Sequence, residues 1–195
     1  MMTAKKIKQS ALELISQRGY SDTTLSLIAE RVGIKKPSIY SHFESKEDIF
    51  FCILEDETKN LKKYIESILD DIKESELDES LYLIIYKFAN YFNKNKILAK
   101  FWNIVMYFPP YSLEKEFKSE FNLVKDKIYQ HIYINFKEKH KNEKFDEEEM
   151  KNIIYSYELI LRGILTMIIY DNDFNMEKIK PLCIIYFNGI RNALK

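Results

Sequence analysis

Residues 24–43, TLSLIAERVGIKKPSIYSHF, constrain the fold of this chain more than any other segment. The first half of the segment predicts a short helix, because its apolar residues recur at helical spacing on one face. These residues are Leu25, Ile28, Ala29 and Val32. Gly33 is expected to end this helix, because glycine adopts the left-handed backbone conformation at little cost and so lets the chain reverse. A second helix must then begin within a few residues.

The second half of the segment predicts a short helix over residues 36–42 with one inward and one outward face. Pro37 suits its first turn, where a missing N–H has no consequence, and Ile39 and Phe43 at i, i+4 form the inward face. The outward side chains carry cations, hydroxyls or an imidazole, and they are Lys35, Lys36, Ser38, Tyr40 and His42. Two short helices joined by a glycine turn, with such a face on the second, are typical of a helix-turn-helix motif.

The same residues resemble a known family. The spacing Thr24-x-x-x-Ile28-Ala29-x-x-x-Gly33-Ile34, followed by Ile39-Tyr40-x-His42-Phe43-x-x-Lys46-Glu47, resembles the DNA-binding domain of the TetR family of bacterial repressors. The rest of the chain agrees with that family only in length and helical character. The resemblance implies a dimeric repressor that binds a palindromic operator in double-stranded DNA. It also implies that a small molecule releases the repressor from this operator.

DNA-contacting side chains are therefore expected between residues 24 and 46. Thr24, at a helix start, offers a hydroxyl and free N–H groups to a phosphate, or serves only as a cap. Ser38 and Lys36 are suited to base edges, and Lys36 also to a phosphate. The resemblance assigns Tyr40 and His42 to the DNA backbone and Lys46 to a phosphate. The candidate DNA-binding residues are Thr24, Lys35, Lys36, Pro37, Ser38, Tyr40, His42 and Lys46.

Lys35 departs from the family pattern. It stands where these proteins often carry a Ser or Thr that caps the second helix, and lysine is a poor cap. The start of that helix is therefore expected to fray or to shift by a residue.

Composition favours long helices and excludes several functions. Hydrophobic residues make up 46% of the 195 residues, against only 4 Gly and 4 Pro, and 30 basic residues balance 30 acidic ones. The docking face, rather than the net charge, must therefore supply any phosphate contacts. Cys52 and Cys183 are expected to be free thiols, and no metal, cofactor or nucleophile motif appears. We predict a cytoplasmic protein that is not an enzyme and has neither a signal peptide nor a membrane span.

The pattern predicts an all-α protein of about nine helices. The first should cover residues 3–18, and a long fourth helix should run from a capping box at residues 45–48 to about residue 73. Breaks are expected near residues 74–78, 93–96, 108–111, 139–146 and 171–175. We predict two domains: a three-helix helix-turn-helix domain over residues 1–48, and a helical ligand-binding and dimerisation domain over residues 49–195.

Residues 82–121 hold the densest aromatic content of the chain. Aromatic residues at helical spacing are usually core residues. A cluster of this density, interleaved with asparagines and broken by Pro109-Pro110, also suits the wall of a pocket for a small hydrophobic or aromatic ligand. The candidate ligand-binding residues are Tyr86, Asn90, Trp102, Asn103, Tyr107, Phe108 and Phe121.

The last two predicted helices carry wide apolar stripes, which favour a homodimer interface built as a shared four-helix bundle. A wholly internal core is the alternative. The candidate interface residues are Tyr157, Leu161, Gly163, Ile164, Ile168, Cys183, Tyr186, Phe187 and Ile190. A different function is also left open, in which the DNA-bound protein recruits a protein partner and binds no small molecule.

Overall fold

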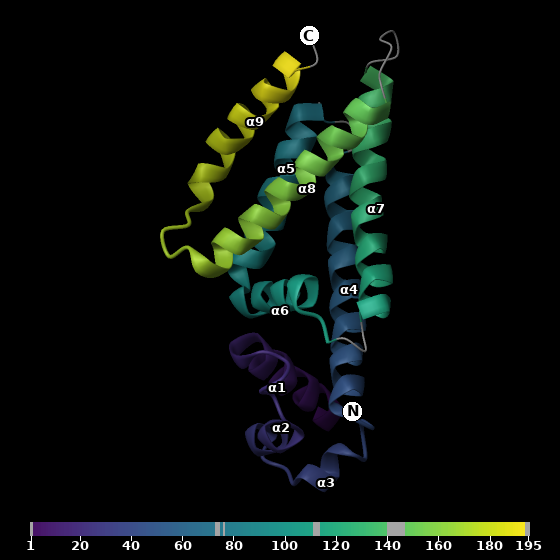
Figure 1. Cartoon of the computed structure of the whole chain (residues 1–195), viewed down its shortest axis with the longest axis vertical. Helices are drawn as coiled ribbons and strands as arrows, with labels where there is room; N and C mark the ends of the chain where they lie inside the picture. Colours follow the sequence, from purple (N-terminus) through teal and green to yellow (C-terminus); the bar gives the residue numbers. More distant parts are fainter. Residues whose placement is uncertain (1, 73–74, 76, 111–113, 140–146, 194–195) are drawn as a thin grey trace. The chain divides into compact units, whose positions relative to one another are not determined.

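The computed structural model describes residues 2–72, 75, 77–110, 114–139 and 147–193, and over these ranges the chain is all-α, as predicted (Figure 1). The described residues form nine α-helices and a short 3-10 helix, η2, joined by loops. They divide into two compact units. Unit 1 holds residues 1–62 and 95–122, and unit 2 holds residues 63–94 and 123–195.

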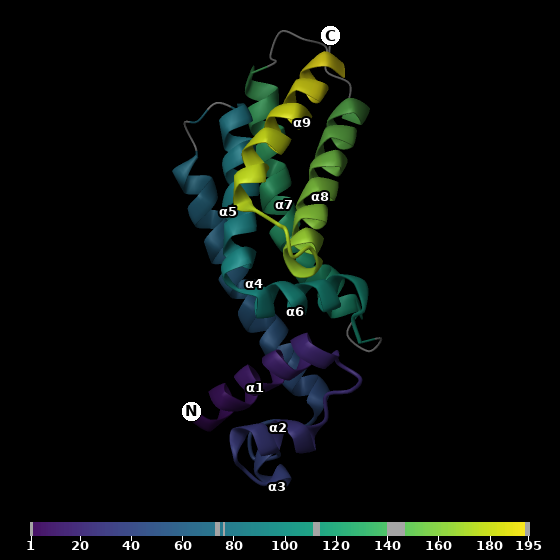
Figure 2. The same cartoon turned by 90° about the vertical axis from the view of Figure 1, so that its left-hand side faces the viewer.

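Unit 1 is built around α1 (Met2–Arg18), which packs against α2 (Leu25–Val32) and α6 (Lys96–Tyr107). Helix α2 also packs against α3 (Lys36–Ile39). Figures 1 and 2 show these three N-terminal helices gathered beside the first turns of α4 (Lys46–Asp71). Helix α1 thus supplies the apolar surface that two short helices cannot provide alone.

The core of unit 1 joins aliphatic and aromatic side chains from all of these helices. Ile7, Ile28 and Ile39, from α1, α2 and α3, are fully buried. The Phe50 ring of α4 lies 5.4 Å from the Phe101 ring of α6, measured between ring centres. Burial of side chains of this size stabilises a fold by roughly 1.5–3 kcal/mol each, so this core holds the helix-turn-helix in place.

Unit 2 is centred on α5 (Leu77–Lys94), which packs against α8 (Glu147–Tyr170) and α9 (Ile179–Ala193). The segment η2 (Met176–Lys178) precedes α9, and residues 123–139 of α7 (Glu114–Lys139) complete the unit. The buried Tyr157 hydroxyl of α8 donates a hydrogen bond of 2.9 Å to the Leu81 carbonyl of α5. A buried hydroxyl with such a partner fixes how the two helices meet.

The helix limits follow the predicted breaks with one clear difference. Helix α3 covers only residues 36–39, whereas the sequence predicts residues 36–42. The N–H groups of His42 and Phe43 both donate to the Ile39 carbonyl, at 2.8 and 3.0 Å, so the chain tightens into a turn after Ile39. This turn brings Phe43 into the core. Parts of three predicted breaks lie outside the described part of the chain, namely residues 74 and 76, residue 111, and residues 140–146.

The start of α4 forms the predicted Ser45 cap, but the return bond of the capping box comes from the residue before Ser45. Ser45 Oγ accepts a hydrogen bond of 3.0 Å from the Asp48 N–H, and the Asp48 carboxylate accepts one of 2.9 Å from the Glu44 N–H. Two backbone donors at the helix start are thereby satisfied. These bonds fix the start of α4 at Ser45, and Lys46 is the residue that follows it.

Helix α8 is long and apolar enough to cross a membrane by length and composition alone. It also carries the Glu158–Arg162 ion pair in its middle, with a bond of 2.6 Å, and buries one face in unit 2. Charged residues are costly at the centre of a bilayer, so this ion pair favours packing of α8 against unit 2 over a membrane span.

Candidate nucleic-acid interface

The turn between α2 and α3 is set by hydrogen bonds that the sequence anticipates. Thr24 caps α2, because its hydroxyl oxygen accepts a bond of 3.2 Å from the Leu27 N–H. Gly33 has φ +78°, and the N–H of Ile34 returns to the Ala29 carbonyl at 2.9 Å. This is the left-handed helix ending that glycine permits. The predicted glycine turn is confirmed.

The α3 segment presents one face to the core and the other to solvent. Ile39 is fully buried and Phe43 is nearly so. Lys35 precedes α3 without any side-chain capping bond, as expected of a lysine. Six of the predicted DNA-binding side chains of this segment are exposed: Lys35, Lys36, Pro37, Ser38, Tyr40 and His42. The exposed Thr24 and the half-buried Lys46 complete the predicted set.

Lys46 has a partner that the sequence reasoning missed. Its ammonium group donates a hydrogen bond of 2.8 Å to the Tyr20 carbonyl and lies 4.0 Å from the centre of the Tyr20 ring. Burial lowers the pKa of Lys46, while the charges of Glu47 and Asp22 act in the opposite direction. An ammonium group has three donors, so a lysine held in this way still has donors for a phosphate. The aromatic residue directly after Gly19 was the only signal for this contact.

Tyr20 also links this lysine to the interior of unit 1. Its ring meets the Phe50 ring edge to face, with 5.2 Å between centres. Burial, and then the charge of Glu47, raises the pKa of Tyr20 to about 12. The hydroxyl is therefore neutral at physiological pH.

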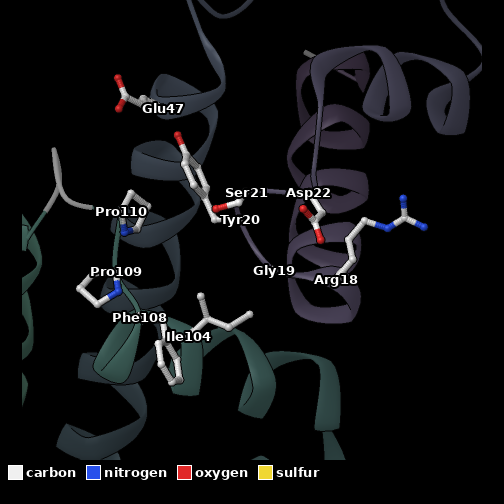
Figure 3. Close-up of a pocket in the computed structure, with 10 residues that line it drawn as sticks. All are labelled: Arg18, Gly19, Tyr20, Ser21, Asp22, Glu47, Ile104, Phe108, Pro109 and Pro110. Atoms are coloured by element: carbon white, nitrogen blue, oxygen red, sulfur yellow. The ribbon is translucent and has the colours of Figure 1, made fainter.

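A pocket of about 710 Å³ lies in unit 1 beside Tyr20 (Figure 3). Residues from three segments line it: Arg18, Gly19, Tyr20, Ser21, Asp22, Glu47, Ile104, Phe108, Pro109 and Pro110. Of the predicted ligand-binding residues whose side chains the structure describes, only Phe108 is among them. The sequence predicted a pocket wall near Pro109-Pro110, but it did not predict that residues 19–22, which follow α1, would line the same pocket.

The other predicted ligand-binding residues are distributed over both units. Trp102 and Asn103 are buried in unit 1, where Tyr107 is exposed. Tyr86 is partly exposed and Asn90 is half-buried, and both belong to unit 2. The side chain of Phe121 lies outside the described part of the structure. A single cavity lined by the whole set therefore stays a prediction.

Most predicted interface residues of α8 and α9 have their side chains inside unit 2. The buried ones are Tyr157, Leu161, Ile164, Ile168, Cys183 and Phe187. Tyr186 is half-buried and donates or accepts a bond of 2.7 Å with Ser156, while the Ile190 side chain is not described. These side chains therefore contribute to the core of unit 2, and their part in a dimer interface stays a prediction.

The surface available to a partner is the opposite face of the same helices. Its large exposed apolar side chains are Tyr155, Leu159, Met167, Tyr170, Leu182, Ile184 and Ile185. Gly163, from the predicted set, is exposed on this side of α8, and a Cβ added there would meet nothing within 4 Å in this chain. The apolar stripe predicted from the sequence is thus wide enough to serve both the core and the surface.

Among the described residues no group of three or more His, Cys, Asp or Glu side chains is placed to hold a metal ion. Cys52 and Cys183 are free thiols, as expected. Burial is the first cause that raises the pKa of both thiols, to about 11 for Cys183. Both are therefore thiols rather than reactive thiolates at physiological pH.

Comparison with known sequences finds relatives of the N-terminal part. Residues 7–53 match the family described as bacterial regulatory proteins, tetR family. The chain is 36% identical over 85 residues to IcaR of Staphylococcus aureus strain Newman, a negative transcriptional regulator of the biofilm operon icaADBC. That match covers 43% of this chain and 44% of the relative, so it spans less than half of the curated protein.

Comparison with solved structures extends over nearly the whole chain. The fatty acid degradation regulator FadR of Bacillus halodurans has a TM-score of 0.71 at 15% identity, with 92% of each chain covered. FadR of Bacillus subtilis, solved with stearoyl-CoA, has a TM-score of 0.69 at 21% identity, covering 92% of this chain and 96% of that one. At these identities the likeness shows a shared fold.

Proposed function

We infer from its membership of the TetR family of bacterial regulatory proteins that this chain is a DNA-binding transcriptional regulator. One observation supports this inference most strongly. The α2–turn–α3 segment has a helix-turn-helix geometry, with a buried Ile39 and an exposed row of hydroxyl, imidazole and ammonium side chains. Such a row is suited to phosphates and base edges in a major groove.

We propose that Lys46 and Thr24 position the motif on the DNA backbone while Ser38 and Lys36 read bases. The helix start at Thr24 offers backbone N–H groups, and a phosphate binds favourably at such a site. Lys46 follows the capped start of α4, and the Tyr20 carbonyl holds its ammonium group. The exposed hydroxyl of Ser38 either donates to or accepts from a base edge.

We propose that the protein acts as a homodimer through α8 and α9. The exposed face of these helices carries the large apolar side chains given above, and such faces are typical of association surfaces. A two-fold pair of helix-turn-helix motifs would bind the two halves of a palindrome, and their binding energies would roughly add. The domain division at residue 48 belongs to the same proposal, as does a cytoplasmic location.

We propose that a small apolar ligand weakens DNA binding, so that the protein is a repressor released by its effector. The aromatic content of residues 82–121 favours this ligand class, and FadR of Bacillus subtilis binds stearoyl-CoA. A ligand that binds better to a DNA-incompetent state lowers operator affinity, typically by about 1–3 kcal/mol of coupling. No enzymatic role is proposed.

The decisive experiment is selection of genomic fragments on the purified full chain, followed by fluorescence anisotropy on the selected duplex. We expect a palindromic site bound far more tightly than a scrambled duplex of equal length and composition. Equal affinity for the two duplexes at physiological salt would contradict the proposed function.

The same duplex then separates the effector proposal from the alternative of a ligand-free adaptor. Stearoyl-CoA is the first compound to add, with coenzyme A alone as the matched control. A decrease in operator affinity with stearoyl-CoA but not with coenzyme A supports an apolar effector. If a broad panel of apolar compounds left operator affinity unchanged, the adaptor would be favoured.

A further inference from the structure

The pocket in unit 1 has a composition that suits a particular kind of ligand. Its apolar lining comes from the end of α6 and the loop after it, with Ile104, Phe108, Pro109 and Pro110. Its polar lining comes mainly from residues 18–22 and from the first turn of α4. A volume of about 710 Å³ lies within the usual range for small-molecule sites.

The charges of the pocket favour a cation. Asp22 and Glu47 each contribute a carboxylate, and the Tyr20 hydroxyl points toward Glu47 (Figure 3). Figure 3 also shows the Arg18 guanidinium directed away from the other lining side chains. The exposed ring of Phe108 adds aromatic surface, which attracts cations by electrostatics, whereas the Tyr20 ring already holds the Lys46 ammonium.

Tyr20 joins this pocket to the candidate DNA contact. Its side chain lines the pocket, and its carbonyl oxygen and ring hold the Lys46 ammonium. The two carboxylates of the pocket, Asp22 and Glu47, are also the charges that act on Lys46. Anything that neutralises these carboxylates changes the electrostatic potential at the lysine that would meet a phosphate.

We propose that this pocket binds an organic cation with an apolar body, and that occupancy strengthens DNA binding. The proposal of strengthened binding rests on the proposed DNA-binding function. A bound cation adds positive charge beside Tyr20, whose ring centre is only 4.0 Å from Lys46 Nζ. A charge within the screening length of about 8 Å at physiological salt still acts on a phosphate that Lys46 contacts. The cation also offsets two carboxylates that would repel phosphates.

The cation is expected to strengthen DNA binding, whereas the apolar effector proposed above is expected to weaken it. The two sites also differ, because the described lining of this pocket shares only Phe108 with the predicted ligand-binding residues. By linkage, DNA must raise the affinity for the cation by the same factor by which the cation raises the affinity for DNA.

The binding site is tested on the full chain without DNA, by isothermal titration calorimetry. The probe is tetraphenylphosphonium, and the matched control ion is tetraphenylborate, which has nearly the same size and shape but the opposite charge. We expect the cation to bind and the anion to bind at least about tenfold more weakly. Equal affinity for the two ions, or no binding of the cation, overturns the proposal.

Three variants locate the bound cation. We expect Asp22→Asn and Glu47→Gln each to weaken tetraphenylphosphonium binding by about two- to tenfold, and Arg18→Gln to strengthen it by a smaller factor. Glu30→Gln makes the same chemical change as Glu47→Gln on an exposed α2 residue outside the lining. It should leave affinity unchanged. Equal affinities in Glu47→Gln and Glu30→Gln, with circular dichroism confirming that both are folded, would overturn the site.

The coupling is tested by fluorescence anisotropy on the selected duplex, at constant ionic strength, with and without tetraphenylphosphonium. We expect about two- to tenfold tighter DNA binding in the wild type, consistent with one added charge near the phosphates. The gain should be lost in Asp22→Asn. Unchanged or weaker DNA binding overturns the coupling. If the chain bound no duplex at all, the proposed function and the coupling would both be refuted. The calorimetric titrations without DNA would still show whether the pocket binds the cation.

Discussion

At the scale of single residues, the helix-turn-helix depends on a few positions whose roles differ in kind. Gly33 supplies a backbone conformation, Ile39 supplies burial, and Lys46 supplies charge. The Lys46 contact with Tyr20 orients the ammonium before any DNA is present. Holding a side chain in place in advance reduces the entropy lost on binding.

Lys46→Ala is expected to weaken binding to specific and random duplexes by similar factors and to reduce the salt slope by about 1, because one phosphate contact is lost. Ser38→Ala should instead reduce the preference for the selected site. Anisotropy titrations over a range of salt concentrations measure both effects. Identical behaviour of the two variants would contradict the proposed division between phosphate contact and base reading.

Gly33→Ala is expected to destabilise unit 1 by about 1–2 kcal/mol, because alanine is strained in the left-handed region. A Cβ at this position would meet nothing within 4 Å, so the cost is conformational and not steric. Urea unfolding measures the change. Ser26→Ala is the comparison, because Ser26 is an exposed residue with helical backbone in α2, and alanine there should not lower stability. A loss of stability in both variants would argue against this explanation.

At the scale of helices, the polar contacts of unit 2 fix how α7 meets α8. The Tyr129 hydroxyl donates to the Glu158 carboxylate, and Arg162 donates to the same group at 2.6 Å. Lys125 of α7 lies 3.6 Å away. Burial by itself would raise the pKa of Glu158, but these hydrogen bonds and charges outweigh it and leave the pKa lowered.

Glu158→Gln is therefore expected to destabilise the protein at pH 7 and to have a smaller effect in acid. A carboxyl group with a lowered pKa in the folded state stabilises that state above the usual value of 4.5, and this stabilisation is lost as the pH falls through the folded-state pKa. Urea unfolding at pH 7 and below pH 4.5 measures the difference. Glu149→Gln, at an exposed position of the same helix, is the control. A loss that did not depend on pH would contradict the ionic explanation.

At the scale of the whole molecule, the proposed function requires two copies. Leu159→Glu places a charge on the exposed face of α8, where Leu159 is 52% exposed. We expect monomers in analytical ultracentrifugation, together with a loss of operator affinity, because the two motifs would no longer bind as a pair. The control is Ile134→Glu on α7, where Ile134 is 54% exposed. Dimers in the Leu159 variant, or monomers in both variants, would contradict an interface on α8.

Local sequence features were sufficient for the elements of this fold. The left-handed Gly33, the Thr24 cap and the Ser45 cap depend on neighbours within a few residues, and each was predicted from the chain alone. The end of α3 was wrong by three residues, because the burial of Phe43 and the paired bonds to the Ile39 carbonyl override the helical spacing.

The all-α class, the order of the helices and the helix-turn-helix were all predictable, because they depend on periodicity and turn chemistry. The buried face of each helix depends instead on how the helices pack together. Periodicity marks α8 and α9 as apolar, but packing against α5 assigns Tyr157 and Phe187 to the interior and leaves Leu159 and Ile185 exposed. The pocket beside Tyr20 likewise required the fold, because it joins residues 18–22 to residues 104–110 through contacts distant in sequence.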